Sequence, residues 1–360
     1  MKKKYYNILK KIEEKGFSAY IVGGYVRDFL LGKETSDIDI ITNATPKDLS
    51  SIFNDDVCRF KGYGSLKLNI DDQIIDITTF RTELSYENGK PIIEYTSSLE
   101  DDLKRRDFLI NTLVMDKEEK IIDLLDARKD IDDKIIRTVN DEDKELREDP
   151  VRILRAIRFM TSLKFKLSDT LLEYIVNHKE LIKQINLVKK KEELDKIFKS
   201  DNVNIFFDFI KKYELEEVLG IRINVVNKVS SLIGIWSQVD ILEDFPFTKY
   251  EKEQINEIKY LINKNKIDKI DLYKKGLYLS VIASEILCIS KEKLNAMYKE
   301  IPIKDKRDIK ITSKEICEYL QIKPGVKLGS ILKNVEELSV NGKLKNTKED
   351  IIEYLKKEVK

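Results

Sequence analysis

The stretch 21–42, IVGGYVRDFLLGKETSDIDIIT, constrains the fold of this chain more than any other. It predicts a short apolar strand, a turn at Gly23 and Gly24, a brief amphipathic helix and a second, alternating strand. Asp37 and Asp39 stand two residues apart in that second strand. Because side chains alternate between the faces of a strand, both carboxylates are expected on one face while the isoleucines beside them pack inward.

Two carboxylates on one strand face suit hard divalent cations. Same-face positions lie roughly 6.6 Å apart, so two short side chains can converge on two ions about 3.5 to 4 Å apart. Magnesium prefers oxygen ligands and fills the rest of its shell with water and phosphate oxygens. The pattern therefore predicts two Mg²⁺ ions held by Asp37 and Asp39, with a nucleoside triphosphate completing the site.

The glycine pair fits an anion beside these acids. Gly23 and Gly24 allow backbone N–H groups to approach a phosphate, and a following helix start adds partial positive charge. Arg27, about one turn further on, is placed to donate to a phosphate oxygen. Each motif alone has an ordinary explanation, since a glycine pair is often only a turn and alternating acids are often solvated. Their order and spacing together are much more specific.

The pattern GGYVRDFLLG followed by DID resembles the nucleotidyltransferases of the DNA polymerase β superfamily. More narrowly, it resembles the bacterial tRNA nucleotidyltransferases (CCA-adding enzymes) and poly(A) polymerases of the second class. The resemblance implies two-metal nucleotidyl transfer, with Asp37 and Asp39 as catalytic metal ligands. It also implies that Gly24 and Arg27 contact the nucleotide.

A second stretch, 98–116, reads SLEDDLKRRDFLINTLVMD and resembles the second motif of that family. The RRDF segment stands before an apolar run, so its charged residues are expected at the edge of a packed element. The resemblance implies that Arg106 contacts the nucleotide. The alternative from the residues alone is a surface arginine paired with Asp102 or Glu100.

A third constellation begins at Glu148-Asp149-Pro150, a strong signal for the start of a helix. Arg152, Arg155 and Arg158 recur every three residues and share one helix face. Of the 66 basic residues only 13 are arginines, and 11 of these lie at or before Arg158. This clustering indicates positions that need a planar fork rather than a point charge. The alternatives are a solvated face and chance drift in composition.

An acid and an arginine side by side can select a base. Cytosine and adenine both present an exocyclic amino donor beside a ring nitrogen acceptor, which Asp149 and Arg152 can satisfy. Guanine and uracil reverse part of this pattern. A good bidentate pair is worth roughly 1 to 3 kcal/mol of discrimination, or up to roughly a hundredfold at about 1.4 kcal/mol per tenfold. The pair predicts selection of CTP and ATP without a nucleic-acid template.

The family resemblance implies the same roles for Asp149 and Arg152, and further implies that Arg155 and Arg158 line the nucleotide pocket. Asp149 is expected to have difficulty both capping the helix and contacting a base. The sequence therefore suggests that Glu148 shares the capping. Asp76, between two isoleucines on another expected strand, is either a third metal-site carboxylate or an outward-facing strand acid.

Composition excludes several classes of protein. The net charge of +1 provides no overall basic field, so RNA must be held by local patches. Three scattered cysteines argue against a disulfide framework or a zinc cluster, and the single His178, expected at the surface, argues against histidine-based catalysis. No stretch resembles a signal peptide or a membrane span, so we expect a cytoplasmic protein.

The length of 360 residues predicts several modules. No glycine occurs between Gly89 and Gly220 and no proline between Pro150 and Pro246, which favours helices over this span. The segment from residue 301 also resembles the carboxy-terminal region of the family. We expect an α+β fold with a small mixed-sheet nucleotidyltransferase head (1–140) and an all-helical neck (141–200), body (201–300) and tail (301–360). The tail is expected to bind the acceptor end of tRNA, and the oligomeric state is left open.

Two departures from the family pattern keep alternatives open. The segment 82–95, TELSYENGKPIIEY, is shorter and less basic than the flexible segment usual in full CCA-adding members, which is implicated in switching from C to A. The neck segment KKKEELDK lacks an expected arginine. A CC-adding or A-adding specialist or a poly(A) polymerase is therefore an alternative. A non-catalytic RNA-binding module is another, although two retained acids argue against it.

Overall fold

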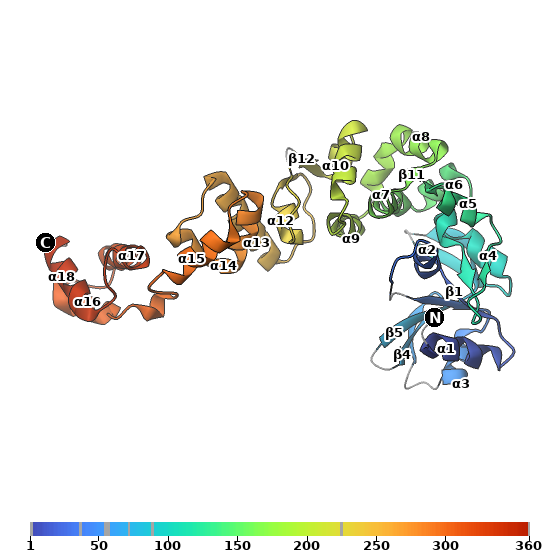
Figure 1. Ribbon diagram of the computed structural model, residues 1–360, viewed down its shortest axis with the longest axis horizontal. Coiled ribbons are helices and arrows are strands. Elements are labelled where there is room, and N and C mark those ends of the chain that lie inside the picture. The colour runs from blue at the N-terminus through green and yellow to red at the C-terminus, as the bar shows by residue number, and fades with distance from the viewer. Residues whose placement is uncertain are drawn as a thin grey trace. The chain divides into compact units, whose positions relative to one another are not determined.

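The computed structural model describes residues 3–35, 38–53, 58–70, 73–87, 90–223 and 226–358. The chain forms two compact units, 1–219 and 220–360. The mixed-sheet head and the mostly helical remainder, both visible in Figure 1, confirm the predicted α+β class. The finer division into head, neck, body and tail stays a prediction.

A seven-stranded mixed sheet with strand order β3-β4-β5-β2-β1-β8-β9 forms the centre of the head. Its strands are β1 (Ala19–Val22), β2 (Asp39–Thr42), β3 (Cys58–Gly62), β4 (Ser65–Ile70), β5 (Gln73–Thr79), β8 (Val114–Met115) and β9 (Ile121–Ile122). Only β2 and β5 pair in parallel, whereas the other neighbours are antiparallel. The parallel pair is important for the site because it sets Asp39 beside Asp76.

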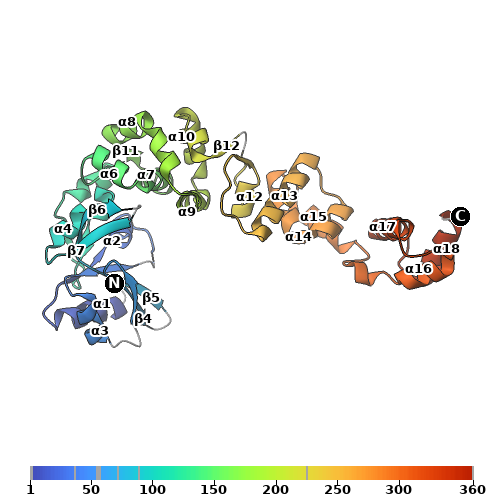
Figure 2. The same ribbon diagram turned by 180° about the vertical axis from the view of Figure 1, so that it is seen from behind.

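Short helices cover the sheet. They are α1 (Lys3–Glu13), α2 (Gly24–Leu30), α3 (Pro46–Phe53), α4 (Leu99–Lys104), the 3₁₀ turn η1 (Leu109–Asn111) and α5 (Ala127–Asp132). Figures 1 and 2 show α1 and α3 on one side of the sheet and α2 on the other. The face of α1 with Ile8, Leu9 and Ile12 is fully buried, as its spacing predicts.

The segment that the sequence shows to be shorter and less basic than the flexible segment of full CCA-adding members forms a hairpin. β6 (Arg81–Glu87) and β7 (Lys90–Tyr95) pair antiparallel in a sheet of their own, with a register shift between Glu83 and Ser85. The hairpin is visible beside α4 in Figure 2.

The rest of the first unit is mostly helical. It contains α6 (Glu142–Glu148), α7 (Val151–Leu163), α8 (Asp169–Asn177), η2 (Lys179–Gln184), α9 (Leu187–Phe198), α10 (Val203–Lys212) and α11 (Glu216–Leu219). Helix α7 follows Pro150 as expected, buries Ile153, Leu154 and Ile157, and ends before Lys164, which has a left-handed backbone (φ 59°). Helix α7 packs against α9, so the residues of both helices can meet at one site.

The second unit contains two hydrophobic cores. Helices α12 (Leu232–Trp236), α13 (Lys249–Lys264), α14 (Lys269–Ile286) and α15 (Lys291–Lys299) supply most of the first. A 3₁₀ turn, η3 (Lys306–Asp308), precedes α16 (Ser313–Leu320), α17 (Val326–Val340) and α18 (Lys348–Glu358), which enclose the second. Gly276 (φ 78°) interrupts α14 with a kink.

Two short strand pairs lie outside the main sheet, and all of their residues except 135–136 fall where the sequence predicted helices alone. β10 (Ile135–Ile136) pairs in parallel with β11 (Lys166–Leu167), and β12 (Ile221–Ile223) pairs with β13 (Val239–Ile241). Alternate residues of β12, Ile221 and Ile223, are buried, so a strand period of two operates inside an otherwise helical span.

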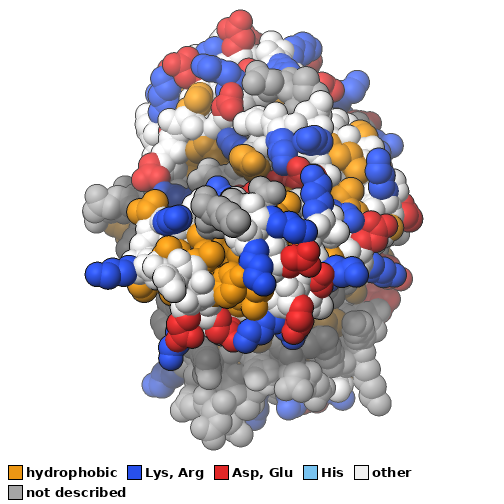
Figure 3. Space-filling view, turned by 90° about the vertical axis from the view of Figure 1, so that its left-hand side faces the viewer, with side chains coloured by type: hydrophobic (Ala, Val, Ile, Leu, Met, Phe, Trp, Pro, Cys, Tyr) orange, Lys and Arg blue, Asp and Glu red, His pale blue; other side chains and the backbone are white. Residues whose placement is uncertain are grey.

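Charges of both signs cover the surface. In Figure 3, Lys and Arg side chains lie among Asp and Glu side chains over the face that is visible. This distribution agrees with the net charge of +1. None of the helices in the described part of the chain is both long and apolar enough to cross a membrane.

Candidate active site

Asp39 lies at the start of β2, in the middle of the sheet. It is in register with Val22 on one side and with Asp76 of β5 on the other. In-register neighbours on adjacent strands point to the same face, so the side chains of Asp39 and Asp76 share one face. The flanking Ile38 and Ile40 are buried, as predicted. Asp37 lies outside the described residues, so its convergence with Asp39 stays a prediction.

The donor set fits a hard divalent cation, because carboxylate oxygens on one sheet face are ligands that magnesium prefers. Asp39 is exposed and Asp76 is partly exposed, so both are accessible from solvent. Within the described ranges, which omit Asp37, no group of three or more His, Cys, Asp or Glu side chains is arranged to hold a metal.

The glycine pair brings two arginines to the turn before α2. Gly23 adopts φ 75°, and a Cβ atom added there would lie 3.7 Å from Nη1 of Arg106. A Cβ atom added to Gly24 would lie 3.5 Å from Nη2 of Arg27. The positive φ of Gly23 explains why a glycine stands there, whereas the guanidinium groups lie at ordinary van der Waals distance.

Arg27 is joined to helix α7 by a buried chain of hydrogen bonds. Nη1 of Arg27 donates to Oδ1 of Asn111 at 2.6 Å, and Nδ2 of Asn111 donates to Oδ1 of Asp107 at 2.9 Å. Nε of Arg155 donates to Oδ2 of Asp107 at 2.8 Å. Burial alone would raise the pKa of the Asp107 carboxyl, but Arg155 and Asn111 outweigh it and lower this pKa to about 2.

Asp107 therefore contributes to stability as an ionised group, and Asp107→Asn is expected to destabilise the first unit by about 2 kcal/mol at pH 7. Its folded pKa lies below its unfolded value, so the contribution is complete above the unfolded pKa and is lost as pH falls toward about 2. The wild-type and variant free energies of unfolding should converge between about pH 5 and pH 2. Urea titrations at several pH values measure this difference, with exposed Asp208→Asn as the control. A difference that does not change with pH would contradict the assignment.

The arginine stripe of α7 is buried against carboxylates, so the solvated-face alternative is wrong. Arg152 pairs with Glu145, Arg155 with Asp107, and Arg158 with Glu193. Their side chains are 10%, 35% and 19% exposed. Sequence reasoning missed these carboxylates, because their positions in the chain carry no pattern that links them to the arginines.

Asp149 lies between α6 and α7, where its side chain contacts the start of α7 and lines a pocket. Its Oδ1 accepts from the backbone N–H of Val151 at 3.2 Å, and its Oδ2 lies 3.9 Å from Nε of Arg152. Burial raises the pKa of the Asp149 carboxyl. The expected sharing of the cap by Glu148 is wrong: Glu148 ends α6 with an exposed side chain. A carboxylate has about four acceptor sites, so Asp149 can bond the helix start and still present an oxygen to a ligand.

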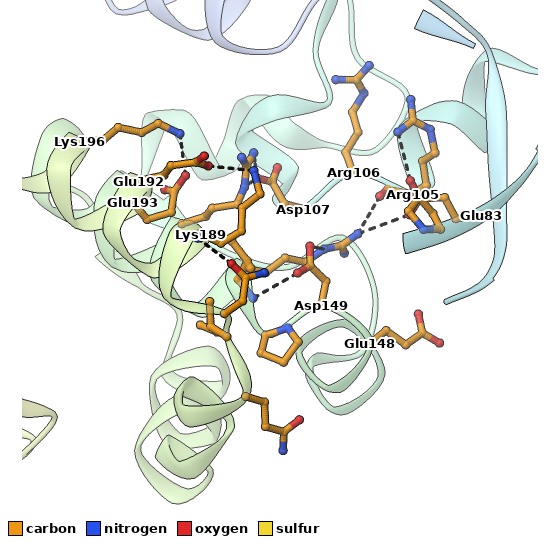
Figure 4. A pocket seen from close by; sticks show the side chains of 18 of the residues that line it. Glu83, Arg105, Arg106, Asp107, Glu148, Asp149, Lys189, Glu192, Glu193 and Lys196 are labelled. Carbon is orange, nitrogen blue, oxygen red and sulfur yellow. Dashed lines mark hydrogen bonds and ion pairs between the residues drawn. The ribbon is translucent and has the colours of Figure 1, made fainter. Parts of the chain in front are cut away.

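A pocket of about 600 Å³ unites four of the predicted residues, Arg106, Asp149, Arg152 and Arg155. Further residues from the hairpin, from α4 and from α9 line it, among them Arg81, Glu83, Arg105, Lys189, Glu192, Glu193 and Lys196. Figure 4 shows the α9 side chains on one side of this pocket and Glu83 with Arg105 on the other. Arg158 reaches its edge through Glu193, whereas Gly24 and Arg27 do not line it.

Arg106 forms one of the two pairings expected from the residues alone, although its side chain is mostly buried. Its Nη2 donates to Oδ2 of Asp102 at 3.1 Å, which is the pairing expected from the residues alone. It also lines the pocket, with its Nη1 near Gly23. Burial lowers the pKa of its guanidinium. Its role as a nucleotide contact stays a prediction.

The β6–β7 hairpin is tied to this pocket by one acid. Oε1 of Glu83 lies 3.6 Å from Arg81 and from Arg105, and its Oε2 lies 3.9 Å from Nη2 of Arg152. The position of the hairpin and the position of Arg152 are therefore linked electrostatically.

Comparisons with known proteins show the family of this chain. Residues 19–137 match the Poly A polymerase head domain family, and residues 233–355 match tRNA nucleotidyltransferase domain 2. A CCA-adding enzyme of Ligilactobacillus salivarius is 34% identical over 99% of this chain and 96% of its own length. The chain belongs to the CCA-adding enzyme family. The CCA-adding enzyme of Bacillus subtilis is 31% identical over 97% of the chain and 96% of its own.

A solved structure of this family has the same fold. The crystal structure of the Bacillus stearothermophilus CCA-adding enzyme in complex with CTP matches with a TM-score of 0.86 and 25% identity, covering 99% of this chain and 96% of that one. The family resemblance seen in the sequence is thus confirmed, and the chain is a nucleotidyltransferase.

Proposed function

We propose that this protein adds C, C and A to the 3′ end of tRNA, using CTP and ATP without a template and releasing pyrophosphate. The observation that carries the proposal is the pocket in which Asp149 and Arg152 lie side by side. Similarity to CCA-adding enzymes over almost the whole chain supports it. We also place the protein in the cytoplasm, as its sequence leads us to expect.

Base selection follows from the chemistry of that pair. One oxygen of Asp149 is bonded to the helix start, and its other oxygen is left to accept from the exocyclic amino group of cytosine or adenine. Arg152 donates to the adjacent ring nitrogen. Arg152 is 10% exposed and held by Glu145 and by the carbonyl of Arg105, so its donors are fixed before the nucleotide arrives. Guanine and uracil present mismatched groups to this pair.

We assign catalysis to Asp37 and Asp39, and Asp76 lies beside Asp39 on the same sheet face. We propose that they hold two Mg²⁺ ions. When bound, such ions activate the 3′ hydroxyl of the RNA and stabilise the departing pyrophosphate. Gly24, Arg27 and Arg106 contact the triphosphate, because the turn before α2 is where two guanidinium groups come near small residues.

The remaining residues hold the RNA. We propose that 1–140 is the catalytic head, that 141–200 is the neck carrying the selecting helix, and that 201–300 and 301–360 grip the acceptor end of tRNA. Lysines are spread along the helices of these last two segments and supply phosphate contacts.

The test is to incubate the purified protein with tRNAs ending at the discriminator base, at C or at CC. Each NTP is supplied singly and in mixture, and the products are sequenced. Ordered addition of CCA supports the proposal. Addition of C alone, of A alone or of long A tails would instead identify one of the specialists to which the short hairpin segment 82–95 points. Absence of magnesium-dependent pyrophosphate release would indicate a non-catalytic RNA-binding module.

A further inference from the structure

The ring of Phe159 in helix α7 lies among three guanidinium groups. The Cζ atoms of Arg158, Arg27 and Arg155 are 4.2, 5.2 and 5.9 Å from the ring centroid. Two of these arginines belong to α7, whereas Arg27 belongs to α2 in the head. The ring itself is 7% exposed and is held from its side by Phe108, edge to face at 5.8 Å and 84°.

This arrangement solves an electrostatic problem. Three like charges around one side chain repel, and each of their carboxylate partners, Asp28, Asp107 and Glu193, orients mainly one of them. The face of an aromatic ring carries negative charge and attracts cations within about 6 Å of its centroid. Phe159 therefore attracts all three arginines at once, across the boundary between α2 and α7.

An aromatic contact also leaves the donors of an arginine usable. The N–H groups of a guanidinium lie in its own plane and point away from a ring stacked on its face. A carboxylate, in contrast, occupies the donors that it orients. Contact with Phe159 thus helps to hold Arg158 and Arg27 in place without using N–H groups beyond those already donated to Glu193, Asp28 and Asn111.

We propose that Phe159 is a positioning residue of the nucleotide site. It holds Arg27 together with Arg155 and Arg158 in one array, although it reaches no reacting atom. This inference rests on the proposed function, because that function assigns these arginines to the incoming nucleotide. Losing the ring should weaken nucleotide binding equally in the ground state and in the transition state, which raises KM and leaves kcat unchanged.

The experiment compares Phe159→Leu, Phe159→Tyr and Phe206→Leu by initial rates on tRNA ending at the discriminator base or at CC. Phe206 is a matched control, because it is fully buried and packs against the rings of Phe198 and Phe207. We expect Phe159→Leu to raise KM for CTP and ATP about tenfold with kcat within threefold, as loss of cation–ring contacts predicts. Phe159→Tyr keeps the ring face and should restore KM. Phe206→Leu should lower the melting temperature and leave KM unchanged.

KM does not depend on the folded fraction, so partial unfolding of a variant leaves the comparison valid. Equal KM values for Phe159→Leu and Phe206→Leu would overturn the proposal. A KM for Phe159→Tyr that stays as high as that of Phe159→Leu would overturn it as well. Calorimetric measurement of CTP binding in the presence of magnesium tests the role of Phe159 separately from the proposed function. If the wild type adds no nucleotide but binds CTP about tenfold more tightly than Phe159→Leu, the proposed function fails and the role of Phe159 stands. Equal CTP affinities would refute that role.

Discussion

Asp39→Asn is expected to lower kcat for CMP addition about a thousandfold. The amide presents one neutral oxygen where the carboxylate presents two charged ones, and a divalent metal supplies several kcal/mol of transition-state stabilisation at about 1.4 kcal/mol per tenfold. Incorporation of labelled CMP into tRNA ending at the discriminator base, at saturating magnesium, measures the loss. The affinity for tRNA should not change, because Asp39 lies in the sheet of the head.

Asp240→Asn is the matched control, since Asp240 is an exposed strand acid in the second unit. It should retain full activity. Asp76→Asn, measured in the same assay, tests whether Asp76 also belongs to the metal site, because Asp76 is in register with Asp39. A loss in Asp76→Asn comparable to that in Asp39→Asn assigns it to the metal site, and near-normal activity leaves it an ordinary strand acid. Retention of a tenth or more of wild-type kcat by Asp39→Asn would refute the assignment of Asp39.

Asp149→Ser is expected to abolish the preference for C and A over G and U, a change of up to roughly a hundredfold in relative kcat/KM. Serine keeps one oxygen that can accept from the N–H of Val151, so the helix start remains bonded. It lacks the second oxygen that we expect to accept from the exocyclic amino group. The kcat/KM values for all four nucleotides on one tRNA measure the change.

Asp143→Ser is the control for this substitution, because Asp143 is an exposed acid of α6 paired with the exposed Arg147. It should leave the ranking of the four nucleotides unchanged. If Asp149→Ser lowers kcat/KM for all four nucleotides by the same factor, Asp149 only supports the fold and base selection lies elsewhere. Arg152→Lys adds a second test, since an ammonium cannot replace the planar fork and should also weaken selection.

Local patterns in the sequence were enough to predict much of the fold. The strand that ends at Val22, the turn at Gly23 and the buried isoleucines around Asp39 each follow from neighbours within a few residues. The helix after Pro150 follows from the same kind of local signal. Such predictions succeed because strand and helix periods are set by backbone geometry, which depends little on the rest of the chain.

The partners of the site residues could not be predicted in this way. Arg27 and Asn111 are 84 residues apart in the sequence, and Arg155 and Asp107 are 48 apart. No local period relates such positions. The β6–β7 hairpin likewise reaches the pocket through Glu83, a contact that the sequence of this segment did not predict. These contacts depend on how the sheet, the hairpin and α7 come together.

The sequence by itself was enough to predict which residues carry the chemistry: an alternating strand with acids, a glycine turn with an arginine, and a helix face of arginines. The tertiary structure alone decided that the arginines of α2 and α7 share the ring of Phe159, and that buried carboxylates such as Asp107 and Glu193 hold them. The physical reason is that burial strengthens charge interactions and is itself a property of the packed chain. Neighbours along the chain set the face of the strand or helix on which a side chain lies. Neighbours in space set the charges that surround it.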